Sequence, residues 1–178
     1  MRELAALLVG DPPEVWESTG FVVADGAVAV SGVALRLGQA EPGLSGWELR
    51  DGAGGPPTPD HPNGVTDIDH VVMATPDLDA TVDTLVAGGH NLRRIREAGN
   101  GVRQAFFRLG PVILEVVGPM EQSGLWGITF TVHDLDATAA FLGDRLGAVK
   151  DAVQPGRRIA TLARSAGSTV PIAFISKQ

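Results

Sequence analysis

Hydrophobic positions near residue 70 recur first at every second residue and then at every third or fourth, which predicts a strand followed by a helix. On the strand, Ile68, His70, Val72 and Ala74 would share one face. The helical stripe consists of Leu78, Val82, Leu85 and Val86. Segments 91–97, 102–109 and 112–117 follow, separated by turn residues, and read as three more strands. The order predicted for this unit is βαβββ.

The same order returns along the chain. Segment 69–81 recurs as 126–138, so that Asp134 repeats the helix-capping position of Asp77 57 residues further on. A weaker copy at 4–16 places Asp11 in the capping role, with Pro12 at the first helical position. The strands expected after these two helices are 21–30, 32–37 and 47–50 in the first unit and 148–153, 158–164 and 170–176 in the third. Such repeats indicate a supersecondary unit that needs a neighbour to bury its apolar face.

The repeats predict an α+β protein of three βαβββ modules. Segment 51–63 is rich in Gly and Pro and reads as a linker between a degenerate first module, 1–50, and paired modules at 64–119 and 124–178. Three modules leave one without its pair. We therefore expect the first module either to pack on the other two or to pair with its copy in a homodimer, which is the commonest closed assembly.

Composition narrows the function classes. The chain has 178 residues, 44% hydrophobic, and a net charge of −7 with no basic block, which argues against nucleic acid or an anionic membrane as partner. Cysteine is absent, so disulfides, thiolate metal ligands and Cys nucleophiles are excluded. The first apolar stretch is too short for a signal peptide, and no segment approaches a membrane span. These features predict a cytoplasmic protein.

The repeat, with Ile-Asp-His-Val at 68–71 and Leu-Glu-Val-Val at 114–117, resembles the vicinal oxygen chelate superfamily, the glyoxalase/bleomycin-resistance/dioxygenase group. Residues 101–119 are especially similar to methylmalonyl-CoA epimerases. The resemblance implies that the paired modules curl into a cup-shaped half-barrel, and that each module offers two inward metal ligands. In the second module these are His70 and Glu115.

In the third module the ligand positions fall on Gly127 and on Phe174, or on Ala173 if the loop is shifted by one residue. None of these side chains can bind a metal. The first module has Leu4 and Glu48 at the matching places. We therefore expect either no cofactor or a weakly bound divalent metal ion held by His70 and Glu115.

Other residues are candidates for binding a ligand in the cup. Alternation along the strand before Glu115 places inside either the set Arg103 and Phe107 or the set Gln104, Phe106 and Arg108. An inward Arg would suit a carboxylate, a phosphate or an enolate. Trp126 neighbours the empty ligand position, and Arg157 and Arg158 lie in a polar turn that could close over an anion. The candidate set is Arg103, Gln104, Phe106, Phe107, Trp126, Arg158 and Phe174.

These residues are compatible with two different functions. One is a glyoxalase-like cup with an incomplete metal site that binds a small aromatic or acidic molecule, a reading favoured by Gly127 and Phe174. The other is a divalent-metal-dependent lyase, isomerase, epimerase or dioxygenase using His70 and Glu115, in which the metal polarises substrate oxygens. The second function lacks a third-module carboxylate, which serves in several relatives as the proton-transfer base.

Overall fold

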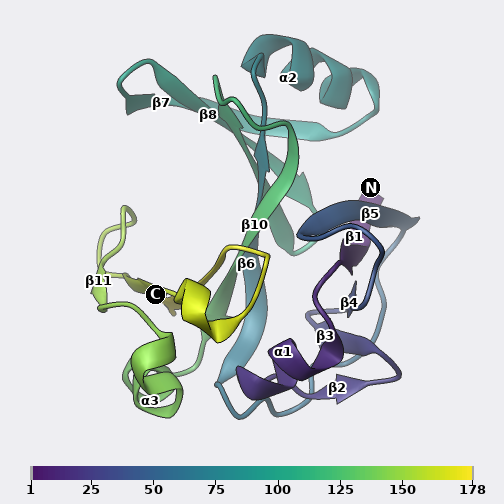
Figure 1. The fold of residues 1–178 in the computed structure, drawn as a ribbon. Coiled ribbons are helices and arrows are strands. Elements are labelled where there is room, and N and C mark those ends of the chain that lie inside the picture. Colours follow the sequence, from purple (N-terminus) through teal and green to yellow (C-terminus); the bar gives the residue numbers. More distant parts are fainter. Residues whose placement is uncertain (1, 178) are drawn as a thin grey trace.

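A computed structural model describes residues 2–177 of the chain (Figure 1). The second module contains β6 (Val65–Ala74), α2 (Leu78–Ala87), β7 (Asn91–Gly99), β8 (Val102–Leu109) and β9 (Val112–Gly118). The third contains β10 (Gly124–Val132), α3 (Leu135–Leu142), β11 (Lys150–Asp151), β12 (Arg158–Thr161) and β13 (Ile172–Ser176), with short 3₁₀ turns at Gly143–Arg145 and Arg164–Ala166. The side chains of Asp77 and Asp134 cap α2 and α3 as predicted. The predicted α+β fold of βαβββ modules is confirmed.

The paired modules share one curved sheet of eight strands in the order β11-β12-β13-β10-β6-β9-β8-β7. Each module's first strand runs parallel to its last, and β6 and β10 pair antiparallel at the centre. The register puts His70, Glu115 and Phe106 on one face, which we call the cup face. Phe130 and Phe174 pair side by side on the opposite face, where α2 and α3 also pack.

The first module repeats this plan with one addition. It comprises β1 (Arg2–Val9), α1 (Pro13–Ser18), β2 (Val23–Ala24), β3 (Ala27–Val30), β4 (Val33–Arg36) and β5 (Leu44–Asp51). Its sheet has the order β2-β3-β4-β1-β5. β1 pairs parallel with β4, as β6 does with β9, but β5 lies antiparallel on its other side, where β6 has β10. The predicted strand 21–30 is in fact a hairpin, because Asp25 and Gly26 turn the chain with positive φ.

The additional strand β5 bears on how the first module assembles. β5 occupies the edge of β1 that another module's first strand would use, so the module needs no second copy to complete that pairing. The module instead packs on the same chain. It lies against the face of the large sheet that is opposite the cup face, away from β7 and β11 (Figure 1). A homodimer stays a prediction, which sedimentation at micromolar concentration would test.

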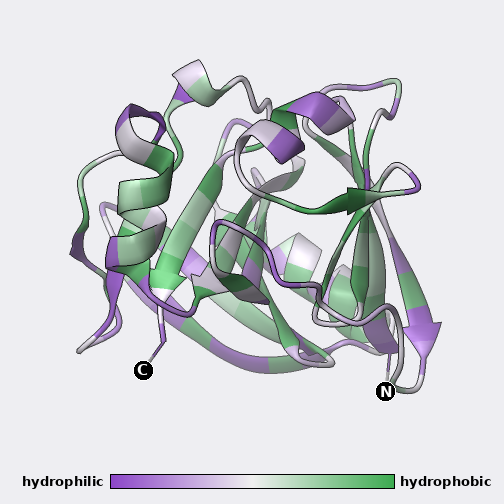
Figure 2. Ribbon diagram, turned by 90° about the horizontal axis from the view of Figure 1, so that it is seen from below, coloured by the Kyte–Doolittle hydropathy of each residue, from purple (hydrophilic) through white to green (hydrophobic). Residues whose placement is uncertain are grey.

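The contact between the first module and the large sheet includes an aromatic cluster. Trp16 is fully buried, and its ring meets those of Phe21 at 4.9 Å and Phe130 at 6.2 Å between centroids. Phe21 also lies 6.4 Å from Phe174. Aromatic burial of this kind dominates core energetics. Figure 2 shows that the strands in the interior of the fold are mostly hydrophobic, while the turns at its outside are more hydrophilic.

Asp11 was predicted to cap the first helix, and that assignment is wrong. The N-cap of α1 is Pro12, whose side chain carries no hydrogen-bond acceptor. The Asp11 carboxylate is 1% exposed and accepts instead from Trp16 Nε1 at 3.2 Å, from Ser168 Oγ at 2.6 Å, and from Thr169 N and Oγ1 at 2.8 and 2.5 Å. It fastens the first module to the loop before β13. The sequence alone could not indicate this contact, because the partner residues are more than 150 positions away.

The predicted linker is also fastened to the first module. His61 is buried, accepts from Val22 N at Nδ1 (3.0 Å), and therefore donates from Nε2 to the Ala29 carbonyl (3.1 Å). Burial lowers the pKa of His61 below its ordinary value of 6.5, against smaller opposing effects of the Ala29 carbonyl and Asp60. The neutral imidazole is thus the form that fits the folded protein.

A pH dependence of stability follows from His61. Because the folded-state pKa is the lower one, the stability that the neutral ring contributes is complete above pH 6.5 and is lost as pH falls through the folded-state pKa. Urea unfolding between pH 6.5 and about 5 should show a shallower loss of stability in His61→Gln than in the wild type. His133→Gln, which changes an exposed ring, should keep the wild-type slope. Equal slopes in all three proteins would refute this role.

No helix within residues 2–177 is both long and apolar enough to cross a lipid bilayer.

Candidate functional site

Two neighbouring strands bring His70 and Glu115 together on the cup face. Glu115 on β9 stands opposite Val72 of β6, one alternate position from His70. His70 Nε2 lies 3.6 Å from Glu115 Oε2, and the two side chains are 16% and 14% exposed. This is an ion pair only when the imidazole is protonated, and otherwise it is a polar contact. A carboxylate this far out of water requires partners, and the neighbouring strands supply them.

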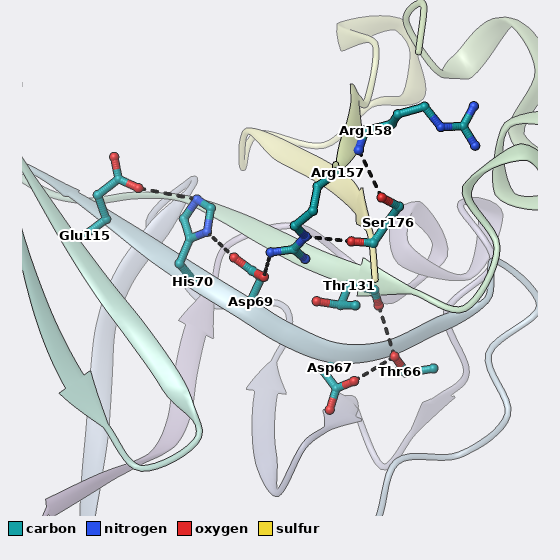
Figure 3. Close-up of polar contacts among 9 residues, drawn as sticks. All are labelled: Thr66, Asp67, Asp69, His70, Glu115, Thr131, Arg157, Arg158 and Ser176. Atoms are coloured by element: carbon teal, nitrogen blue, oxygen red, sulfur yellow. Dashed lines mark hydrogen bonds and ion pairs between the residues drawn. The ribbon is translucent and has the colours of Figure 1, made fainter. Parts of the chain in front are cut away.

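A chain of hydrogen bonds fixes the orientation of the His70 ring (Figure 3). Its Nδ1 lies 2.8 Å from Asp69 Oδ2, and the other Asp69 oxygen accepts from Arg157 at 2.7 Å. Arg157 is itself buried and donates from Nε to the Ser176 carbonyl at 2.7 Å. Asp69 lies in an irregularity of the β6–β10 pairing, which lets it turn toward the third module. The arrangement directs His70 Nε2 toward Glu115.

The protonation state of Asp69 is set by these neighbours. Burial favours its neutral form, but hydrogen bonds from His70 and Arg157 oppose that effect and hold the pKa of Asp69 below its ordinary value. The group is therefore a fixed negative charge behind the His70 ring. It balances the buried Arg157 guanidinium.

The network continues on the other side of Glu115. Gln104 donates to Glu115 Oε1 at 2.5 Å and accepts from Arg96 Nε at 2.6 Å. The guanidinium carbons of Arg94 and Arg96 lie 4.7 and 5.3 Å from the centroid of the Phe106 ring. Stacking of this kind holds cationic groups in place while leaving N–H donors available. Arg94 and Arg96 were not singled out in the sequence, although their two-residue spacing on a strand beside Phe106 was a usable signal.

These side chains line a cavity of about 170 Å³. His70, Glu115 and Gln104 contribute polar groups to its lining, and Ile159 and Ile175 contribute apolar ones. Residues 152–154 of the loop after β11 border it. The cavity therefore combines a carboxylate, an imidazole, two guanidiniums and an apolar wall.

A second hollow of about 160 Å³ lies on the third-module half of the cup face. Gly127, Thr129 and Ala173 line it, together with Trp126, whose side chain is at an exposed rim (residue 46% exposed). Register identifies Ala173 as the counterpart of Glu115, because Ala173 stands opposite Thr129 as Glu115 stands opposite Val72. The alternative of a one-residue shift, raised from the sequence, is thus the arrangement found.

The donor set does not fit the metal that the fold implies. Gly127 and Ala173 carry no donor atom, and one Glu115 oxygen is already bonded to Gln104. Within residues 2–177 no three His, Asp or Glu side chains converge in a way that could hold a metal ion. Cationic Arg94 and Arg96 border the same cavity, which opposes a divalent cation electrostatically. Two protein donors beside two guanidiniums are a better environment for an anion.

Only some of the ligand residues predicted from the sequence border the cup cavity. Gln104 and Phe106 border the cup cavity, but Phe107 lies on the opposite face of β8 and is fully buried. Phe174 is also fully buried, 6.3 Å from Phe130 on the face that meets the first module. The prediction that Phe107 and Phe174 line a cup pocket is therefore wrong, because alternation along their strands points both side chains to the opposite face.

Both predicted arginines are likewise away from the cup. Arg103 pairs with Asp79 of α2 at 2.7 Å, and Arg158 pairs with Asp136 of α3 at 2.8 Å. Each therefore points to the helix side of the sheet. The third-module arginine that reaches the site is Arg157, one residue earlier in the same turn.

Comparison with solved structures identifies the fold. A methylmalonyl-CoA epimerase from Mycobacterium tuberculosis matches with a TM-score of 0.55 and 21% identity over 65% of this chain and 90% of that one. A variant Streptomyces coelicolor methylmalonyl-CoA epimerase in complex with 2-nitronate-propionyl-CoA matches with a TM-score of 0.52 and 28% identity over 64% and 98%. A hypothetical protein from Bacillus halodurans matches at 0.53 and 18% over 63% and 94%. No protein-family model and no curated protein matches.

The chain therefore has the vicinal oxygen chelate fold. The matches cover 63–65% of this chain, which is about the length of the two paired modules. They cover nearly the whole of each neighbour.

Proposed function

We propose that the cup binds a small organic carboxylate, aromatic or aliphatic, without a bound metal. The observation that carries this proposal is the pair of guanidiniums stacked on Phe106 beside His70 and Glu115. Arg96 offers charged N–H donors in a partly buried place, and the cavity also has the apolar wall that a hydrocarbon or ring needs.

Isothermal titration of chelator-treated protein with benzoate and with its uncharged analogue benzamide tests this proposal. Benzoate should bind at least about tenfold more tightly, because a charge-assisted hydrogen bond contributes about 1.5–3 kcal/mol. Arg96→Gln should abolish the difference. Arg103→Gln, which removes the same charge from the helix side of β8, should preserve it. Equal binding of the two compounds, or no effect of Arg96→Gln, would contradict the proposal.

The alternative is a metal-dependent lyase, isomerase, epimerase or dioxygenase using His70 and Glu115. It is favoured by the structural neighbours, which include epimerases described in complex with 2-nitronate-propionyl-CoA and with methylmalonyl-CoA. We expect no epimerisation of methylmalonyl-CoA even with added Co²⁺, because Ala173 supplies neither a ligand nor a base. Metal-dependent turnover that is lost in His70→Ala would favour this alternative instead.

A further inference from the structure

A group of arginines gathers at one end of the cup, and we call it the arginine rim. It consists of Arg93 and Arg94 on β7 and Arg108 on β8. An irregularity in the β7–β8 pairing between Leu92 and Arg94 brings both neighbouring β7 arginines to one hollow. That hollow measures about 500 Å³ and has Phe106 and Ile113 in its lining.

The rim arginines have no counter-charge among residues 2–177. The ion pairs found there within 4.0 Å involve other cationic groups, and no side-chain hydrogen bond is made by Arg93, Arg94 or Arg108. Arg103 and Arg158, which lie on the helix side, each pair with a carboxylate. The clustering is unexpected in a chain of net charge −7, where acidic partners are abundant. Three exposed guanidiniums around an apolar floor form a site for an anionic group.

The rim is continuous with the cup. Arg94 and Phe106 line both the rim hollow and the cup cavity. Gln104, Phe106 and Arg108 are alternate residues on one face of β8, so Arg108 lies about 13 Å along the strand from Gln104, at about 3.3 Å per residue. A ligand whose first charge sits beside Arg96 would need an extended body to place a second charge at Arg108.

Building on the proposed carboxylate site, we infer that the ligand is an extended dianion. One anionic group lies beside Arg96 and His70 in the cup, the hydrocarbon body passes over Phe106, and the second group lies among Arg93, Arg94 and Arg108. Carboxylate and phosphate share the chemistry that a guanidinium fork recognises, so either can supply the outer group.

Titration with sebacate and decanoate, which have the same chain length and two or one carboxylates, tests the second site. Sebacate should bind at least about tenfold more tightly at low salt, and the ratio should shrink as the salt concentration rises past about 0.1 M. The analogue of sebacate with one carboxylate replaced by a phosphonate distinguishes a phosphate from a carboxylate as the outer group. Tighter binding of this analogue than of sebacate identifies a phosphate-type outer group. Weaker binding identifies a carboxylate.

The double variant Arg93→Gln/Arg108→Gln should bind sebacate no more tightly than decanoate. The matched control Arg103→Gln/Arg158→Gln loses the same charge from the helix side and should keep the wild-type ratio. Equal ratios in both double variants, or equal affinity of the wild type for both acids, would overturn the dianion inference. If neither acid binds and benzoate does not either, the carboxylate site itself fails. If decanoate binds through Arg96 without any gain for sebacate, only the rim is refuted.

Discussion

Asp11→Asn is expected to lower the free energy of unfolding by about 3 kcal/mol, a large share of the total for a small protein. The carboxylate accepts from four donors contributed by Trp16, Ser168 and Thr169. An amide of the same shape keeps one acceptor oxygen and turns its NH₂ group toward donors. Buried donors would then be left without partners, and each costs about 1–3 kcal/mol.

Urea denaturation of the wild type and variant measures this change. Asp83→Asn is the matched control, because it makes the same substitution at an exposed position in α2 and should shift stability by less than about 0.5 kcal/mol. Trp16 fluorescence should also change in Asp11→Asn before global unfolding, since its indole loses its acceptor. A loss below about 1 kcal/mol would show that Asp11 does not fasten the first module to the loop before β13.

The modular plan was predictable because it depends on local signals. Period-two alternation, capping Asp77 and Asp134, and Gly-rich turns are each contained within a few residues. Their repetition defined three units, and the register of the large sheet follows the same plan. His70 and Glu115 could be placed on one face because the β6–β9 register is unbroken from His70 to Ala74.

The rest depended on contacts between distant residues and on local irregularities. Asp69 turns toward Arg157 at an irregularity in β6, and alternation alone cannot show which of two adjacent arginines is the buried one. The same uncertainty applied to Arg103 and Gln104, where α2 supplies Asp79 as the deciding partner. β5 looked like a module's last strand, but it pairs on the far side of β1, a choice made by tertiary packing.

The site also departs at two positions from the ligand set that the family resemblance implies. The cup face keeps one imidazole and one carboxylate, and the symmetry-related positions are Gly127 and Ala173. A Cβ on Gly127 would lie 3.0 Å from the Pro171 carbonyl oxygen, so close packing opposes a side chain there. Ala173 has no such restriction and borders an open hollow. Position 173 is therefore the one where a ligand can be reintroduced.

Ala173→Glu is expected to convert the cup into a divalent-metal site. β13 and β6 lie two strand spacings apart, about 10 Å, and a Glu side chain at 173 can extend across Thr129 toward His70 and Glu115. Three protein donors with open positions are the arrangement of catalytic zinc sites. The affinity for Zn²⁺ or Co²⁺ should rise at least about a hundredfold over the wild type, since each added charged ligand contributes several kcal/mol in a partly buried site.

Competition with a chromophoric chelator measures the metal affinity, and the visible spectrum of Co²⁺ reports the coordination geometry. Ala173→Leu is the control for filling the hollow without adding a donor, and it should leave metal affinity at the wild-type level. Ala173→Glu combined with His70→Ala should lose the gain, because only two donors remain. Benzoate affinity should fall in Ala173→Glu without metal, since the new carboxylate repels the ligand, and should recover when metal is added. If the wild type already binds metal as tightly as Ala173→Glu, the two-donor description of the cup is wrong, and so is the metal-free function proposed for it.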